Sequence, residues 1–431
     1  MRVPGRCLYR GFLLLAVLLA HPWASLPGQD LTPSTTPAVF RRYSNHVSKI
    51  QVTENASGAK ASLGSAFFVS NDGLVVTNYH VISELVHNPD RYHAELFDTQ
   101  GASRPVTIAA IDVVHDLAVL RVDPRNDGFF SLNPVILEQG TRLYSLGHPH
   151  DLGLSIVEGT YNGLLQHTLY EKIHFTGSLN PGMSGGPSID DQGRVVGVNV
   201  STSGNQLSFL VPVDRAVVLL NDVRRPGYAV PEDFLAVAGR QLLAYQDIYL
   251  ANLLSDSSAT TVLGHYRLPT NPASFFNCWA DASRLEDIPY EVVDHQCSTD
   301  DYVYISSNHF SGIVEFEHRL ITSTELNRFR FFSLYSDQFR NLGGEMPASD
   351  EDVTPYRCDA RTLDQQGLTM KVLFCVRRYR KLGMLYDAVV RVAVLRERNA
   401  GLLTTLTLSG VSYENAERVS RRYLEAIAWN P

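Results

Sequence analysis

The order of apolar and polar positions divides this chain into two unlike parts. Between about residues 40 and 214, short apolar runs rich in β-branched residues alternate with turn signals such as Asn71-Asp72-Gly73. This pattern predicts an all-β barrel or sandwich region. The strand pattern stops at Arg224-Arg225-Pro226-Gly227, and apolar residues then recur at helical spacing, namely Leu235, Ala238, Leu242, Tyr245, Tyr249 and Leu253. We therefore place a domain boundary there, with one domain over residues 29–225 and a second over residues 226–431.

The second domain mixes strand-like and helical patterns. Apolar runs near residues 302–305, 313–316, 371–376 and 389–395 are typical of strands. A final amphipathic helix is marked by Ala416, Val419, Tyr423 and Ile427. We therefore expect a separate α+β domain after the all-β domain.

The first 28 residues have the pattern of a secretory signal peptide. Arg2, Arg6 and Arg10 precede an apolar stretch over residues 12–20, and small residues follow it. A membrane span needs about 20 apolar residues, so this stretch is too short to anchor the protein. We expect residues 1–28 to be removed and the mature protein to be periplasmic or secreted, without a stable membrane anchor.

Composition narrows the class of protein and of partner. The chain has 431 residues, of which 44% are hydrophobic, and its net charge is −8. This apolar content excludes disordered and collagen-like classes. Basic runs interleaved with aromatic residues are missing from the sequence, so nucleic acid is not an expected partner.

Four cysteines remain once the signal peptide and Cys7 are removed. An even number in an exported chain predicts disulfide bonds rather than free thiols, which are the alternative. Three pairings are possible, and the sequential one, which closes short loops, joins Cys278 to Cys297 and Cys358 to Cys375. No zinc-ligand spacing lies beside these cysteines, so we expect neither a metal nor a cofactor.

Three short stretches of the β region each carry one member of a nucleophilic set. His80 follows a strand-like run, Asp116 precedes another, and Ser184 lies in a glycine-rich turn. A serine hydroxyl becomes a nucleophile when an imidazole takes its proton, and a carboxylate fixes the tautomer of that imidazole. Asp112 is the alternative acid, but only Asp116 directly precedes the apolar run.

These stretches resemble the chymotrypsin-like serine proteases, and most closely the bacterial HtrA (Deg) branch. The resemblance covers about residues 64–214 and implies a double β-barrel. Six blocks follow the order of that family: Gly64-Ser65-Ala66-Phe67-Phe68, Thr77-Asn78-Tyr79-His80, Asp116-Leu117-Ala118-Val119-Leu120, Leu146-Gly147-His148-Pro149, Asn180-Pro181-Gly182-Met183-Ser184-Gly185-Gly186-Pro187 and Val196-Gly197-Val198-Asn199.

The resemblance implies a role for each site residue. His80 is the general base, Asp116 its orienting acid and Ser184 the nucleophile, and the N–H groups of Gly182 and Ser184 form the oxyanion hole. The expected function is an exported serine endopeptidase that cleaves polypeptides through an acyl-enzyme on Ser184. The alternative is a non-catalytic binding protein on a protease fold, in which the second domain carries recognition.

The sequence departs from the HtrA pattern at two places. Met183 stands where relatives usually carry Asn, at a position that contributes backbone rather than side-chain chemistry. The Gly-Leu-Gly-like loop that opens a PDZ domain is not found after Pro212. We therefore do not expect activation through a PDZ domain.

The specificity pocket implied by the resemblance contains no acid. Its floor lies six residues before the nucleophile, at Ser178, and one wall is the strand segment Val200, Ser201 and Thr202. A desolvated Lys or Arg of the substrate without a partner would cost several kcal/mol, so trypsin-like specificity is disfavoured. Thr202 stands where wide pockets carry Gly and narrows the entrance. We therefore expect cleavage after small aliphatic residues.

Overall fold

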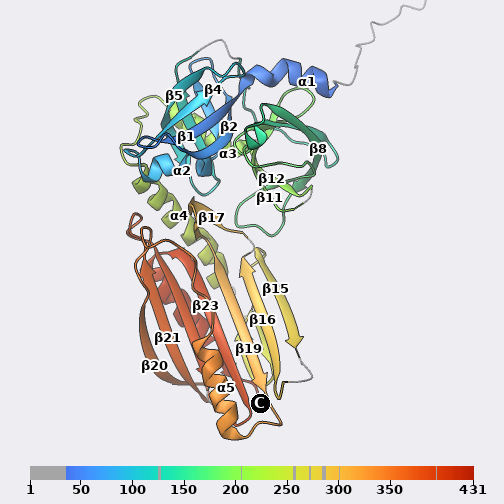
Figure 1. Ribbon diagram of the computed structural model, residues 1–431. Helices are drawn as coiled ribbons and strands as arrows, with labels where there is room; N and C mark the ends of the chain where they lie inside the picture. The colour runs from blue at the N-terminus through green and yellow to red at the C-terminus, as the bar shows by residue number, and fades with distance from the viewer. Residues whose placement is uncertain are drawn as a thin grey trace, which may run out of the picture.

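The computed structural model describes residues 35–431, apart from 125–127, 205, 256–258, 271–272, 284–287, 300 and 395. The predicted signal peptide and Cys7 lie outside the described residues. Two closed six-stranded barrels form one end of the molecule, and a seven-stranded sheet forms the other end (Figure 1). This arrangement confirms the predicted fold class, a double β-barrel followed by an α+β region.

The first barrel has the strand order β1-β2-β3-β6-β5-β4. Its connection from β3 to β4 carries helix α2 (Tyr79–His87), and α1 (Thr36–Tyr43) precedes the barrel. The strands are β1 (Val47–Glu54), β2 (Lys60–Phe68), β3 (Leu74–Thr77), β4 (Tyr92–Phe97), β5 (Ser103–Asp112) and β6 (Leu117–Val122).

The second barrel repeats this topology, with the order β10-β11-β12-β9-β8-β7. Helix α3 (Val213–Arg224) follows it directly. Buried side chains of both barrels, among them Phe67, Leu117, Tyr144 and Val198, form one apolar cluster. The two barrels are therefore packed together rather than merely linked. The strands are β7 (Arg142–Gly147), β8 (Ser155–Leu164), β9 (Ile173–Phe175), β10 (Pro187–Ile189), β11 (Val195–Thr202) and β12 (Ser208–Pro212).

The later part is built around an antiparallel sheet with the order β15-β16-β19-β23-β22-β21-β20. Burial follows position in this sheet, since central β23 is buried along nearly its whole length and edge strand β20 is almost entirely exposed. The strands are β15 (Phe276–Ser283), β16 (Glu291–Thr299), β19 (Val314–Thr322), β20 (Arg357–Gln365), β21 (Leu368–Arg378), β22 (Tyr386–Val394) and β23 (Ala400–Val411).

Helices cover both faces of the large sheet. Helix α6 (Tyr413–Glu425) packs on β22 and β23, and α5 (Arg328–Arg340) places Phe331 and Tyr335 in a separate cluster with Leu403. The remaining strands are β13 (Thr260–Leu263), β14 (Tyr266–Pro269) and β24 (Ala428–Trp429) in one small sheet, and β17 (Val303–Ser306) and β18 (His309–Ser311) in a hairpin.

Helix α4 (Phe234–Ser255) lies between the barrels and the large sheet (Figure 1). Its first half packs on the first barrel through Ala238 and Leu242, and its second half packs on the large sheet through Tyr249 and Leu253. The predicted boundary at residue 225 falls between α3 and α4, and the division into two separately folding domains stays a prediction. In the described part of the chain, no helix is both long and apolar enough to cross a bilayer.

The four later cysteines form two disulfide bonds with the sequential pairing. Cys278–Cys297 joins β15 to β16, and Cys358–Cys375 joins β20 to β21. Both edge strands of the large sheet are thus covalently fastened to their neighbours.

Candidate active site

His80 and Asp116 meet where the first barrel faces the second. Asp116 lies in the turn before β6, and its carboxylate accepts two hydrogen bonds from His80, at 2.8 Å from the backbone nitrogen and 2.6 Å from Nδ1. Its backbone oxygen accepts from the Asn78 side chain at 2.8 Å and from the Tyr79 N–H at 3.2 Å. Since Nδ1 donates to the carboxylate, Nε2 carries the free lone pair that a general base needs.

The charge of Asp116 sets the electrostatics of His80. Burial lowers the pKa of the His80 imidazole, but the charge and hydrogen bond of Asp116 together raise this pKa by more than burial lowers it. The pKa of His80 therefore lies above its ordinary value of 6.5. The His80 side chain is 27% exposed and the Asp116 side chain 7%, which leaves one ring edge accessible. His80 therefore has the orientation and the partial exposure that a general base needs.

The competing acid, Asp112, is engaged elsewhere. Its carboxylate lies 2.7 Å from Nδ1 of His115 and also accepts the His115 N–H. In the structure Asp116, not Asp112, is hydrogen-bonded to His80, and the catalytic role of Asp116 stays a prediction.

Ser184 lies in a turn whose backbone only glycine can form. Gly182 has a φ of +95° and Gly185 a φ of +83°, and an added Cβ would come within 2.4 Å of the His148 oxygen or 2.2 Å of the Ser65 oxygen. The N–H of Gly185 donates to Asn199 O, and the Ser65 N–H donates to Ser184 O, which fixes the turn against both barrels. The glycines are required by close backbone approach, not only by turn propensity.

The Ser184 hydroxyl donates a hydrogen bond to Val200 O at 3.2 Å. A hydroxyl has a single proton, so in this arrangement it is not donated to His80. Such catalytic hydrogen bonds are often long or unmade without substrate. The structure thus brings Ser184 beside Val200 but does not show a Ser184–His80 hydrogen bond.

The backbone around Ser184 leaves two donors available. Among the hydrogen bonds of the described residues, none uses the N–H of Gly182 or of Ser184. The carbonyl of Gly182 accepts from Ser65 Oγ at 2.7 Å, which directs that oxygen away. Met183 is fully buried in an apolar cluster, and its N–H donates to Asn180 O at 3.0 Å. The N–H groups of Gly182 and Ser184 are thus available for the predicted oxyanion hole.

A cavity of about 630 Å³ opens beside His80 and Asp116. His80, Asp116, Val200, Ser201 and Thr202 line it. Ser184, whose hydroxyl bonds to Val200 O, is not in its lining, and the predicted floor residue Ser178 is exposed outside it. The role of Ser178 stays a prediction. Sequence reasoning missed the rest of the lining, which is Leu165, His167, Thr168, Tyr170, Lys172, Ser203, Leu207, Phe209, Asp301, Tyr302 and Tyr304.

Comparisons with known proteins find sequences and a structure that are similar to part of this chain. A family model described as the trypsin-like peptidase domain matches residues 64–198. A probable periplasmic serine endoprotease DegP-like of Chlamydia pneumoniae is 31% identical over 195 residues, 43% of this chain and 38% of that protein. The chloroplastic Protease Do-like 5 of Arabidopsis thaliana is 30% identical over 191 residues, 38% of this chain and 58% of that protein. A solved structure, the serine endoprotease from Yersinia pestis, is 25% identical and covers 45% of this chain and 68% of its own, with a TM-score of 0.39.

The two barrels and the residues at their junction define a chymotrypsin-like fold. Residues 64–198 match the trypsin-like peptidase domain, and the predicted resemblance to the HtrA (Deg) proteases is confirmed over this part of the chain. The chain covers less than two thirds of the length of the two relatives named above.

Proposed function

We propose that this protein is an exported serine endopeptidase that hydrolyses polypeptides through an acyl-enzyme on Ser184. The observation that carries the proposal is the His80–Asp116 pair, with its oriented ring and raised pKa, in a cavity that is also lined by Val200, to whose carbonyl Ser184 of the glycine turn donates. Its relatives include proteins named as periplasmic serine endoproteases, which supports both the activity and the export. The reaction needs no metal and no cofactor.

In the proposed reaction the Ser184 oxygen attacks the carbonyl carbon of the peptide bond while His80 Nε2 takes the hydroxyl proton. The N–H groups of Gly182 and Ser184 stabilise the oxyanion that forms. His80 then gives its proton to the leaving amine, and the acyl group stays on Ser184 until water attacks it. Asp116 holds the ring in place and stabilises its positive charge without itself taking the proton.

We propose that the cleaved peptide bond follows a small aliphatic residue of the substrate. The segment Val200–Thr202 borders the cavity beside His80. The two acidic residues of its lining, Asp116 and Asp301, are already paired with His80 and Lys172. A hydrophobic pocket discriminates between neighbours by about 1–3 kcal/mol per methylene, so the preference should be graded.

A serine-reactive fluorophosphonate probe tests the mechanism, followed by mapping of cleavage sites in a denatured proteome. We expect the wild-type protein to be labelled and Ser184→Ala and His80→Ala to lose nearly all labelling, because the residues act as one unit. Ser103→Ala, an exposed serine on β5, is the matched control and should label normally. Cuts should follow Val, Ala, Ile or Thr.

Normal labelling of Ser184→Ala would refute the nucleophile, and dominant cleavage after Lys or Arg would refute the pocket. An unlabelled wild-type protein would favour the non-catalytic alternative, a binding protein on a protease fold.

A further inference from the structure

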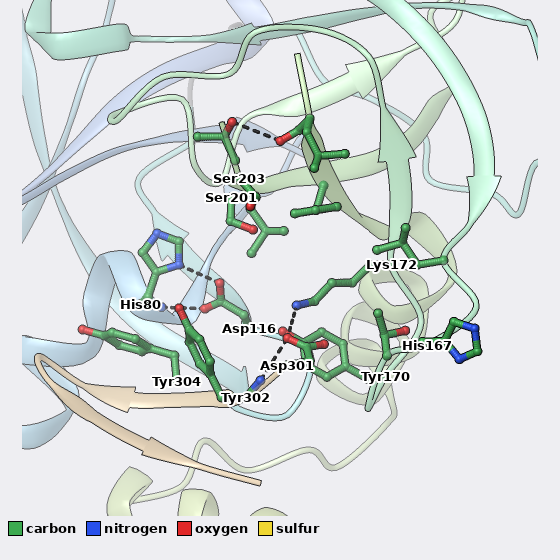
Figure 2. A pocket seen from close by; sticks show the side chains of 16 residues that line it. His80, Asp116, His167, Tyr170, Lys172, Ser201, Ser203, Asp301, Tyr302 and Tyr304 are labelled. Atoms are coloured by element: carbon green, nitrogen blue, oxygen red, sulfur yellow. Dashed lines mark hydrogen bonds and ion pairs between the residues drawn. The ribbon is translucent and has the colours of Figure 1, made fainter. Parts of the chain in front are cut away.

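Part of the wall of the active-site cavity comes from the α+β region, not from the barrels. Asp301, Tyr302 and Tyr304 lie at and before β17, more than a hundred residues after the peptidase domain, yet line the same cavity as His80 (Figure 2). The ring of Tyr304 lies edge-on to the His80 ring, with centroids 5.9 Å apart. Its hydroxyl lies 3.4 Å from Ser83 Oγ on α2.

This wall is attached to the first barrel through α2. The hydroxyl of Tyr79 donates to Ile305 O at 3.0 Å, and Ser307 Oγ donates to Glu84 at 3.3 Å. Val303 and Ile305 are buried in the same apolar cluster as the core of the first barrel. The alternate residues of β17 therefore point into the protein, which leaves Tyr302 and Tyr304 on the face toward the cavity.

A buried ion pair attaches the wall to the second barrel. Lys172 Nζ, just before β9, lies 2.6 Å from Asp301 Oδ1, and the two side chains are only 11% and 12% exposed (Figure 2). The same ammonium lies over the Tyr170 ring, 4.5 Å from its centroid. The α+β region is thus fixed to both barrels around the cavity. We call this ion pair the Lys172–Asp301 clasp.

The exposed chemistry of the cavity suits a large uncharged side chain. Tyr170, Val200, Leu207, Phe209 and Tyr304 present aromatic or aliphatic surface. The charges of Lys172 and Asp301 neutralise each other. A charged side chain of the substrate would therefore lose its hydration in the cavity without gaining an ion-pair partner from the clasp. A volume of about 630 Å³ also exceeds what a single small aliphatic residue fills.

We propose that β17 forms a specificity wall of the substrate cleft, and that the cavity holds a large apolar or aromatic residue next to the cleaved position on its N-terminal side. This inference rests on the proposed endopeptidase function, since it assigns the segment Val200–Thr202 to the acyl part of the substrate. The α+β region then selects substrates directly, through Tyr304, rather than by recruiting them at a distance.

The test measures binding and labelling separately. Two synthetic peptides carry Val at the predicted cleavage position and either Phe or Ala immediately before it. In full-length Ser184→Ala protein, which does not turn them over, the Phe peptide should bind about 10-fold more tightly than the Ala peptide. Adding Tyr304→Ala should remove most of this preference, whereas Tyr304→Phe should keep it because the ring remains.

The matched control is Tyr413→Ala, a half-exposed tyrosine on α6 outside this cavity, which should leave the preference unchanged. Fluorophosphonate labelling of Tyr413→Ala with Ser184 restored should stay within about twofold of wild type, because Tyr413 lies outside the cavity. Equal weakening of both peptides by Tyr304→Ala, or a preference that survives it, would overturn the proposal. Failure of the wild-type protein to label would instead reject the proposed activity, and the binding preference would still report on the wall.

Discussion

At the scale of single residues, the backbone conformation of Asp116 determines where its carboxylate points. Its φ of +54° is in the left-handed region, which aspartate adopts more readily than most residues. Hydrogen bonds from Asn78 and Tyr79 to its carbonyl hold this conformation. The turn therefore aims the carboxylate at both the backbone and the ring of His80, which a residue inside regular β-strand would not do.

The raised pKa of His80 leads to a prediction about pH. Since the imidazolium is stabilised by Asp116, protonation should disable the base as the pH falls through a value above 6.5. Asp116→Asn should slow labelling about 10⁴-fold, and its residual rate should decline only at lower pH, because burial then acts on His80 without a compensating charge. Fluorophosphonate labelling rates between pH 5 and 9 measure both effects. An unchanged pH profile in Asp116→Asn would contradict the assignment.

Local motifs explain why the sequence predicted some site residues and missed others. His80, Asp116 and the turn of Gly182 and Ser184 each lie within a short pattern that their own chemistry demands. Tyr304 lies in a run that predicted only a strand, because nothing local indicates which side chain will reach a cleft built by distant segments. The Ser184 bond to Val200 was likewise missed, since side-chain rotation leaves no pattern in the sequence.

At the scale of secondary-structure elements, strand register decides what the sequence left open for the cysteines. Three pairings were possible, but Cys278 lies directly opposite Cys297 in β15–β16, and Cys358 lies opposite Cys375 in β20–β21. Register depends on which strands become neighbours and on their turns, and the cysteine spacing alone does not fix it. The strand predictions near residues 302–305, 371–376 and 389–395 needed only local pattern, and strands β17, β21 and β22 overlap them.

The attachment of β17 to the second barrel predicts a non-additive effect on stability. Lys172→Met should destabilise the protein by about 3–5 kcal/mol, because it leaves the buried Asp301 carboxylate unpaired. Asp301 Oδ2 already has no hydrogen-bond partner, so the clasp is what makes burial of this charge tolerable. The double variant Lys172→Met/Asp301→Leu should recover most of the loss, since apolar side chains then replace both charges.

Thermal unfolding of the wild type, both single variants and the double variant gives the full cycle. Arg421→Met, which breaks the exposed pair of Arg421 and Glu417 on α6, is the control and should change stability by less than about 1 kcal/mol. Additive losses in the double variant would show that the clasp does not act as a pair.

At the scale of the whole molecule, the barrels and the α+β region share one apolar cluster. It joins Val75 and Leu120 of the first barrel to Leu242 of α4, Ile305 of β17 and Tyr379 after β21. The sequence predicted a boundary near residue 225 from a change of pattern, but the pattern could not indicate that the later segments would return to cover the first barrel. Contacts between segments so far apart in the chain arise from tertiary packing.

Two buried histidines at this junction have ionisation states coupled to folding. His87 on α2 and His309 on β18 have pKa values lowered to about 4, mainly by burial. Tyr79 donates its hydroxyl proton to Ile305 O and so accepts from His87 Nε2, which leaves His87 Nδ1 buried without a partner. Asp352 favours the charged form of both rings, whereas Lys381 opposes it and Arg377 also opposes it at His309. Both imidazoles are therefore neutral in the folded protein at neutral pH.

These two histidines should make the protein sensitive to acid. In the unfolded chain they titrate near 6.5, so between about pH 6.5 and 4 the unfolded state binds more protons than the folded state. The free energy of unfolding is then fully retained above pH 6.5 and falls as the pH drops through this window, by up to about 3 kcal/mol for each histidine. His309→Gln should reduce the difference in thermal midpoint between pH 7.5 and pH 4.5, even if it lowers the midpoint at both. His93→Gln, at an exposed histidine on β4, is the control and should leave that difference unchanged. If His309→Gln and wild type lose equal stability on acidification, the buried junction is not where the protons bind.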